Sequence, residues 1–237
     1  DFCLGDTGSM TGHSPDATIA AIKRQADIGI TSMLPTLDAA IVSKELAARF
    51  GLPKWQFTVT ATDANRHVIR YCRLITGRSK IIVIDRCYHG SVDETFATLD
   101  DAGNTVKREG NLGAPVDLAV TTRVVEFNDL TGMEAALAHG DVAAILMEPA
   151  MTNVGIVLPE DGYLVAVQDL AKKYGALLII DETHTISVGP GGMTKLHKLK
   201  PDMLTIGKAI AGGLPTGTFG MTKAIADQIA AKVQREI

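Results

Sequence analysis

Lys208 occupies a position that suits covalent chemistry. It follows a short apolar run, residues 203–206, and precedes a stretch that contains Gly212, Gly213 and Gly217. Small neighbours let another molecule approach the amine closely, and a lysine amine can form a carbon–nitrogen double bond with a carbonyl compound. A surface lysine whose stem packs on the protein while its ammonium reaches water would have the same local sequence. Lys208 alone leaves both interpretations open.

Two carboxylates directly follow apolar runs that have the character of buried strands. Glu148 follows residues 142–147, and Asp181 follows residues 176–180. A buried carboxylate is costly unless a cation or a hydrogen-bond donor partners it. Either residue could therefore serve a binding site, or could instead cap a helix or pair with an arginine.

Ala61 and Thr62 lie between a run of β-forming residues and a predicted helix. The free N–H groups and the dipole of a helix N-terminus favour a phosphate at such a place. An ordinary cap, with Thr60 or Thr62 as the N-cap, is the alternative. Tyr88 and His89 follow the next apolar run, and they could border a planar ligand or only fill a loop.

Together, these groups match the parts that pyridoxal phosphate requires. Its phosphate needs helix N–H donors, its ring an aromatic face, its pyridine nitrogen a carboxylate and its aldehyde a lysine. Ala61 with Thr62, Tyr88, Asp181 and Lys208 supply these parts in that order along the chain. The combination predicts a pyridoxal 5'-phosphate site, which no single residue does.

The elements that must position these residues predict an α/β fold. Unbroken apolar runs are typical of parallel strands, and helical segments alternate with them. We therefore expect a mostly parallel sheet with helices on both faces, and a long surface excursion over residues 99–120. The predicted strands are residues 55–60, 80–84, 121–127, 142–147, 176–180 and 203–206. The predicted helices are residues 17–28, 36–50, 63–76, 130–139, 162–174 and 224–237.

Composition and charge argue against several classes of protein. The 237 residues include 23 Lys and Arg against 27 Asp and Glu, a formal net charge of −4, so a nucleic-acid or polybasic membrane partner gains no support. No apolar run approaches the roughly 18 residues that span a bilayer. Cys3, Cys72 and Cys87 show no Cys-x-x-Cys spacing, which argues against a disulfide framework and a metal site. We expect a cytoplasmic protein.

Five segments resemble the class III aminotransferases of the pyridoxal-phosphate fold type I superfamily. They are LGDTGSMTGHSPDATIAAI (4–22), TATDANRHVIRYCRLITGRSKIIVIDRCYHG (60–90), LMEP (146–149), LLIIDE (177–182) and PDMLTIGKAIAGGLPTGTFG (201–220). The last is the most specific, because a lysine followed by Gly-Gly-x-Pro-x-Gly after a short strand is hard to obtain by chance.

The resemblance implies a role for each matching residue. Lys208 would carry the internal aldimine and move the proton between carbons, and Asp181 would hold the pyridine nitrogen. Tyr88 would stack on the ring, and Ala61 and Thr62 would bind the phosphate.

The resemblance also implies four more contacts around the cofactor. His89 would border it, Glu148 would organise the ring's surroundings, Thr183 would face the ring, and His184 would lie near the ring hydroxyl. At positions 183 and 184 the chain departs from the residues that the family usually has.

The family further implies a domain plan and a partner. Residues 1–50 would form an N-terminal segment with the first large helix, and residues 51–237 the cofactor-binding large domain. The C-terminal small domain has no match, so we expect a segment of a longer protein. Members of the family usually work as homodimers.

Three segments are most similar in sequence to the β-amino-acid, β-phenylalanine-type transaminases. They are LGDTGSMTGHSP, WQFTVTATDANR and CYHGSVDETFATL. This predicts transfer of an amino group from a (β-)amino acid to a 2-oxo acid. Glutamate semialdehyde aminomutase, which returns the nitrogen to the same carbon skeleton, is the main alternative. A catalytically silent segment of the same fold is another. A dinucleotide-binding domain would need Gly-x-Gly-x-x-Gly after the first strand, and that motif is missing.

Overall fold

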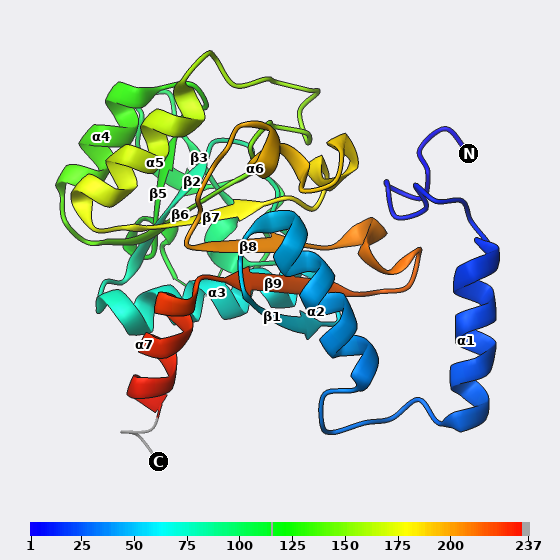
Figure 1. The fold of residues 1–237 in the computed structure, drawn as a ribbon. Helices are drawn as coiled ribbons and strands as arrows, with labels where there is room; N and C mark the ends of the chain where they lie inside the picture. Colours follow the sequence, from blue (N-terminus) through cyan, green and yellow to red (C-terminus); the bar gives the residue numbers. More distant parts are fainter. Residues whose placement is uncertain (115, 234–237) are drawn as a thin grey trace.

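The computed structural model describes residues 1–114 and 116–233. A seven-stranded sheet, in the order β1-β9-β8-β7-β6-β2-β5, forms its centre (Figure 1). Its strands are β1 (Lys54–Thr58), β2 (Lys80–Ile84), β5 (Thr122–Val125), β6 (Val142–Met147), β7 (Leu177–Asp181), β8 (Met203–Ile206) and β9 (Gly217–Met221). The helices are α1 (Asp16–Ile28), α2 (Leu37–Phe50), α3 (Ala61–Thr76), α4 (Leu130–Ala138), α5 (Tyr163–Tyr174), α6 (Gly192–Leu196) and α7 (Lys223–Val233).

The strand directions confirm a mostly parallel sheet. Strands β5, β2, β6, β7 and β8 pair in parallel, and only β9 runs against them. Because β9 is antiparallel to both β8 and β1, β1 points the same way as the parallel strands. The carboxyl ends of β1, β2, β7 and β8 therefore meet at one edge, where ligands of such sheets bind.

Helices cover both faces of the sheet, as expected. Leu204 and Ile206 of β8 pack with Leu46 and Phe50 of α2. Thr205, which points to the opposite face because side chains alternate along a strand, bonds to α3. Helices α2 and α3 thus sandwich β8 between them, and the chain segments that follow β8 are held from both sides.

Helix α3 ends where its sequence predicts and begins two residues before the predicted start at position 63. The hydroxyl of Thr60 accepts a hydrogen bond from the backbone N–H of Asp63 at 3.1 Å, so Thr60 is the N-cap. Gly77 ends the helix with a left-handed backbone. One face, including Val68, Ile69 and Cys72, is buried against the sheet. This fixes the N-terminus of α3 at the ligand-binding edge.

Two expectations for local structure need correction. Ser14 and Asp16 flank Pro15 and predict a side-chain cap for helix α1, but Pro15 is the N-cap and no side chain caps the helix. The predicted excursion over 99–120 contains part of a hairpin, because β3 (Ala97–Leu99) pairs with β4 (Thr105–Lys107). Strand β9 was not predicted.

The ends of the chain differ from the body of the fold. Helix α1 has no buried residue and stands away from the sheet in Figure 1. The predicted C-terminal helix is present as α7, while its last four residues, 234–237, lie outside the described residues. Among the helices that the structure describes, none has the length and apolar character needed to cross a membrane.

Candidate active site

A cavity of about 330 Å³ lies at the carboxyl edge of the sheet. Segments that follow β1, β2, β7 and β8 form its walls. Of the predicted site residues, those that line it are Ala61, Thr62, Tyr88, His89, Asp181, Thr183, His184 and Lys208. The fold therefore brings together groups that are up to 147 positions apart only because four strands end at one edge.

Lys208 begins a 3₁₀ turn directly after β8, and its backbone is strained. Its φ of 50° lies in the left-handed region, which costs a residue with a Cβ about 1–2 kcal/mol. Such strain is typical of functional positions. Its Nζ lies 2.8 Å from Nε2 of His184 and 3.1 Å from a carboxylate oxygen of Asp6. The amine is therefore held at the cavity wall by groups from two other parts of the chain.

His184 is the neutral partner in this contact. Burial, followed by the positive charge of Lys208, holds the pKa of His184 below its ordinary value of 6.5. An uncharged imidazole can accept a hydrogen bond at Nε2 from an ammonium group. His184 therefore accepts a hydrogen bond from the amine of Lys208 at the cavity wall.

Asp181 ends β7 and is only 3% exposed. Its Oδ2 accepts hydrogen bonds from Nδ1 of His89 at 2.8 Å and from Nδ2 of Asn65 at 3.0 Å. Its Oδ1 accepts one from the backbone N–H of Thr183 at 3.0 Å. Burial alone would raise the pKa of Asp181, but these donors lower it below its ordinary value. The carboxylate stays ionised although it is buried.

His89 is the cationic partner of Asp181. Burial alone would lower the pKa of His89, but Cys87 and Asp181 beside it raise that pKa well above its ordinary value. A buried carboxylate and imidazolium that hydrogen-bond directly satisfy the rule that buried charges are paired. His89 thus supports Asp181 from behind as well as lining the cavity.

The N-terminus of α3 offers an anion cradle. The first N–H groups of a helix have no acceptor within the helix, and those of Ala61 and Thr62 have none elsewhere in the described ranges. Two glycines allow the close packing around them. A Cβ on Gly90 would collide with the side chain of Thr62, and one on Gly207 would lie 2.7 Å from the Cβ of Ala61.

Glu148 does not line the cavity. It is buried at the end of β6, where one carboxylate oxygen accepts a hydrogen bond from the hydroxyl of Thr152. Its other oxygen has no partner among the described groups. Burial raises the pKa of Glu148, and the nearby His89 opposes that rise. Glu148 therefore lies beside His89, outside the cavity wall.

The sequence analysis missed three residues that the structure places at the site. Asn65 is fully buried and bonds to Asp181, Thr205 bonds to Asn65, and Asp6 contacts Lys208. Asn65 could have been found as the polar residue on the apolar face of a predicted helix. Asp6 carries no such signal, because it lies in a loop 202 positions from Lys208.

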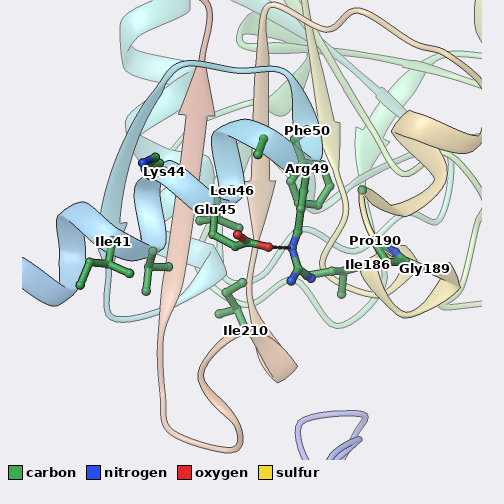
Figure 2. Close-up of a pocket in the computed structure, with 13 residues that line it drawn as sticks. Ile41, Lys44, Glu45, Leu46, Arg49, Phe50, Ile186, Gly189, Pro190 and Ile210 are labelled. Carbon is green, nitrogen blue, oxygen red and sulfur yellow. Dashed lines mark hydrogen bonds and ion pairs between the residues drawn. The ribbon is translucent and has the colours of Figure 1, made fainter.

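A larger cavity, of about 790 Å³, lies between α2 and the segments that precede α6 and follow β8 (Figure 2). Ile41, Phe50, Ile186 and Ile210 give it apolar walls. Glu45 and Arg49 also line this cavity, and they form an ion pair on the surface of α2 with 2.7 Å between Nε and Oε1. The charged residues that line it, Lys44, Glu45 and Arg49, are all exposed on α2, so the chemistry belongs to the smaller cavity.

The residues around the smaller cavity fit pyridoxal phosphate. The cradle of α3 suits the phosphate, and an ionised buried carboxylate suits the protonated pyridine nitrogen. Lys208 supplies an amine for the aldehyde, and the buried Thr183 hydroxyl has no partner among the described groups. The fold is that of the fold type I class of pyridoxal-phosphate proteins.

The chain belongs to the aminotransferase class-III family, whose sequence model matches residues 1–234. The family expected from the motifs is therefore confirmed. Pyridoxal phosphate is the cofactor of this family, which confirms the cofactor predicted from the site.

Proteins of more than one activity are similar to the chain. A glutamate-1-semialdehyde 2,1-aminomutase of Methanoculleus marisnigri is 38% identical over 226 residues, which is 93% of this chain and 54% of that protein. A crystal structure of a glutamate-1-semialdehyde aminomutase from Pseudomonas aeruginosa PAO1 is 53% identical, with a TM-score of 0.94 over 98% of this chain and 51% of that chain. A lysine-to-alanine variant of it forms a complex with PMP.

A β-phenylalanine aminotransferase from Variovorax paradoxus also has this fold. It is 26% identical to the chain, with a TM-score of 0.82 over 95% of this chain and 50% of that chain. The chain spans about half the length of the curated relatives it matches.

Proposed function

We propose that the full-length protein is a pyridoxal-phosphate enzyme that moves an amino group between neighbouring carbons of one small amino acid, as an aminomutase does. The observation that carries the proposal is the convergence of Lys208, Asp181 and the N-terminus of α3 on one cavity. The proposal that the amino group stays within one molecule rests on the names of the relatives that are 53% and 38% identical.

Each of the predicted site residues has a part in this proposal. The N–H groups of Ala61 and Thr62 bind the phosphate, and Asp181 holds the protonated pyridine nitrogen. When bound, the cofactor withdraws electrons from a carbon attached to the substrate amine. The amine of Lys208 would hold the cofactor through its aldehyde, and once the substrate amine has displaced it, it would be free to take a proton from one carbon and return it to another.

Five residues orient this machinery. Tyr88, which packs edge-on against Phe96, covers one face of the ring, and Thr183 faces the other. His184 lies beside Lys208 and borders the ring hydroxyl. His89 borders the cofactor and keeps Asp181 charged, and Glu148 contributes to this arrangement through His89.

Transfer from a β-amino acid to a 2-oxo acid is the second candidate. The segments LGDTGSMTGHSP and CYHGSVDETFATL favour it, as does the similarity to the β-phenylalanine aminotransferase. The two candidates use the same residues and differ in whether a separate acceptor is required.

A second copy of the chain is the expected partner, in a homodimer. Helix α1 has no buried residue, and it exposes Ile22 and Ile28 together with Ile30 and Met33 in the segment that follows. Exposed apolar surface of this kind marks an interaction site. Sedimentation of the full-length protein tests the dimer.

The three cysteines are free thiols, which supports a reducing compartment such as the cytoplasm.

The reaction is tested with the full-length protein loaded with pyridoxal or pyridoxamine phosphate. We expect glutamate 1-semialdehyde to be converted with no added amino acceptor. Conversion of β-phenylalanine only when 2-oxoglutarate or pyruvate is present would favour the second candidate. If no amino compound changes the absorbance spectrum of the bound cofactor, the proposal fails and the silent-segment alternative gains.

A further inference from the structure

We propose that Asn65 and Thr205 are positioning residues that present one oxygen of Asp181, Oδ1, to the cofactor. The proposal rests on the proposed function only in requiring that the cavity binds pyridoxal phosphate. Neither residue lines the cavity, so the proposal gives each of them a role that acts through Asp181.

The two oxygens of Asp181 differ in their hydrogen bonds. Oδ2 accepts from both Asn65 and His89, whereas Oδ1 accepts only from the backbone of Thr183. A carboxylate oxygen can accept about two hydrogen bonds. The donors of Asn65 and His89 therefore saturate Oδ2 and leave Oδ1 free to accept one more.

Asn65 makes its full set of contacts inside the protein. It is fully buried, and its Nδ2 donates to Asp181 and to the backbone carbonyl of His89, both at 3.0 Å. Its Oδ1 accepts from the hydroxyl of Thr205 at 2.8 Å. A flipped amide would turn its oxygen toward two acceptors, so the contacts permit only one orientation.

Thr205 ties this amide to the sheet. It is the direct partner of Asp181 in the ladder between β7 and β8, and it is fully buried. Its hydroxyl reaches Asn65 on α3, which packs on that face. The chain of contacts from Thr205 to Asn65 to Asp181 therefore couples the helix that holds the phosphate to the strand that holds the ring nitrogen.

Asn65 donates to Oδ2 of Asp181 as a neutral side chain, in contrast to the cationic His89 on the same oxygen. The titratable groups around Asp181 are Cys87 and His89 after β2, Glu148 after β6, His184 after β7 and Lys208 after β8. An amide donor stabilises the carboxylate without adding charge, so its contribution does not depend on the protonation of these neighbours.

The test compares variants of the full-length protein in two measurements. These are the dissociation constant of pyridoxal phosphate and the pH midpoint of the visible absorbance of the bound cofactor. Asn65→Leu removes the amide at similar volume, and Thr205→Val removes only the hydroxyl. Thr205→Ser restores the hydroxyl. Thr218→Val is the matched control, because that buried hydroxyl bonds to the Gln56 carbonyl at 2.7 Å, away from Asp181.

We expect Asn65→Leu to weaken cofactor binding roughly tenfold or more, since a hydrogen bond to a charged group is lost. It should also shift the pH midpoint. Thr205→Val should change both in the same direction but less, while Thr205→Ser and Thr218→Val should match the wild-type protein. If Asn65→Leu does not fold, the comparison of Thr205→Val with Thr205→Ser tests the proposal by itself.

The proposal is overturned if Thr205→Val alters only the melting temperature, as Thr218→Val would, and leaves binding and midpoint unchanged. These measurements need no turnover. A wild-type protein that binds the cofactor but transfers no amino group would refute the proposed function and leave the roles of Asn65 and Thr205 intact.

Discussion

Nζ of Lys208 lies 2.8 Å from Nε2 of His184, although the two residues follow different strands. The carboxylate of Asp6 lies on the same amine at 3.1 Å. The amine thus has a neutral acceptor and an anionic one within reach before it bonds to anything else. Any change in the charge of His184 acts directly on Lys208.

Acid should weaken the contact between His184 and Lys208. The pKa of His184 is lowered in the folded protein, so the unfolded chain binds more protons in the interval just below 6.5. The stability that depends on this residue is therefore present above pH 6.5 and is lost as pH falls through the lower folded pKa. Urea unfolding of wild-type and His184→Asn protein at pH 7.5 and pH 5 checks this. Equal losses of stability on acidification would contradict it.

Replacing Lys208 should abolish the visible band of the bound cofactor. Lys208→Ala and Lys208→Gly both remove the amine, so both should lose that band and amino transfer. The two variants should differ in stability, because only glycine tolerates a φ of 50° without strain. We expect Lys208→Gly to be more stable than Lys208→Ala by about 1 kcal/mol in denaturant unfolding. A band that survives in either variant would overturn the assignment of the amine.

Gly90→Ala should damage the phosphate cradle. The added Cβ would meet Thr62 at a φ of +81°, so both strain and a collision are expected. Gly103→Ala is the control, since Gly103 has a φ of +79° and nothing within 4 Å. Each variant should lose about 1 kcal/mol of stability from the backbone. Only Gly90→Ala should also weaken pyridoxal phosphate binding, and equal binding by the two variants would refute the cradle.

Glu148→Gln should stabilise the protein at neutral pH. Burial raises the pKa of Glu148, so the folded state favours its protonated form. Above that raised folded pKa the buried charge opposes folding, and a neutral isostere removes the penalty while it can still accept from Thr152. The advantage of Glu148→Gln should shrink as pH falls through the raised pKa. Thermal unfolding at pH 7 and pH 4.5 measures it, and a larger advantage at pH 4.5 would show the reverse sign.

The sequence could not reveal β9, although it lies inside the sheet. The segment Gly217–Met221 contains two glycines and no apolar run, which is typical of a loop. Tertiary contacts explain the glycines. A Cβ on Gly220 would lie 2.6 Å from the ring of Trp55, and one on Gly217 would collide with the backbone of Thr60. Only the neighbouring strand makes these small residues necessary.

The sequence by itself determined the alternation of strands and helices, the family, and the places of Asp181 and Lys208 at strand ends, and it offered Thr60 and Thr62 as alternative caps. Those features follow from apolar periodicity, capping chemistry and motif spacing, all of which are local. The tertiary structure decided that Asn65 and Thr205 bond to the Asp181 network, that Asp6 reaches Lys208, and that Glu148 lies outside the cavity. Those contacts join residues far apart in the chain, and a polar side chain carries no local sign of its distant partner.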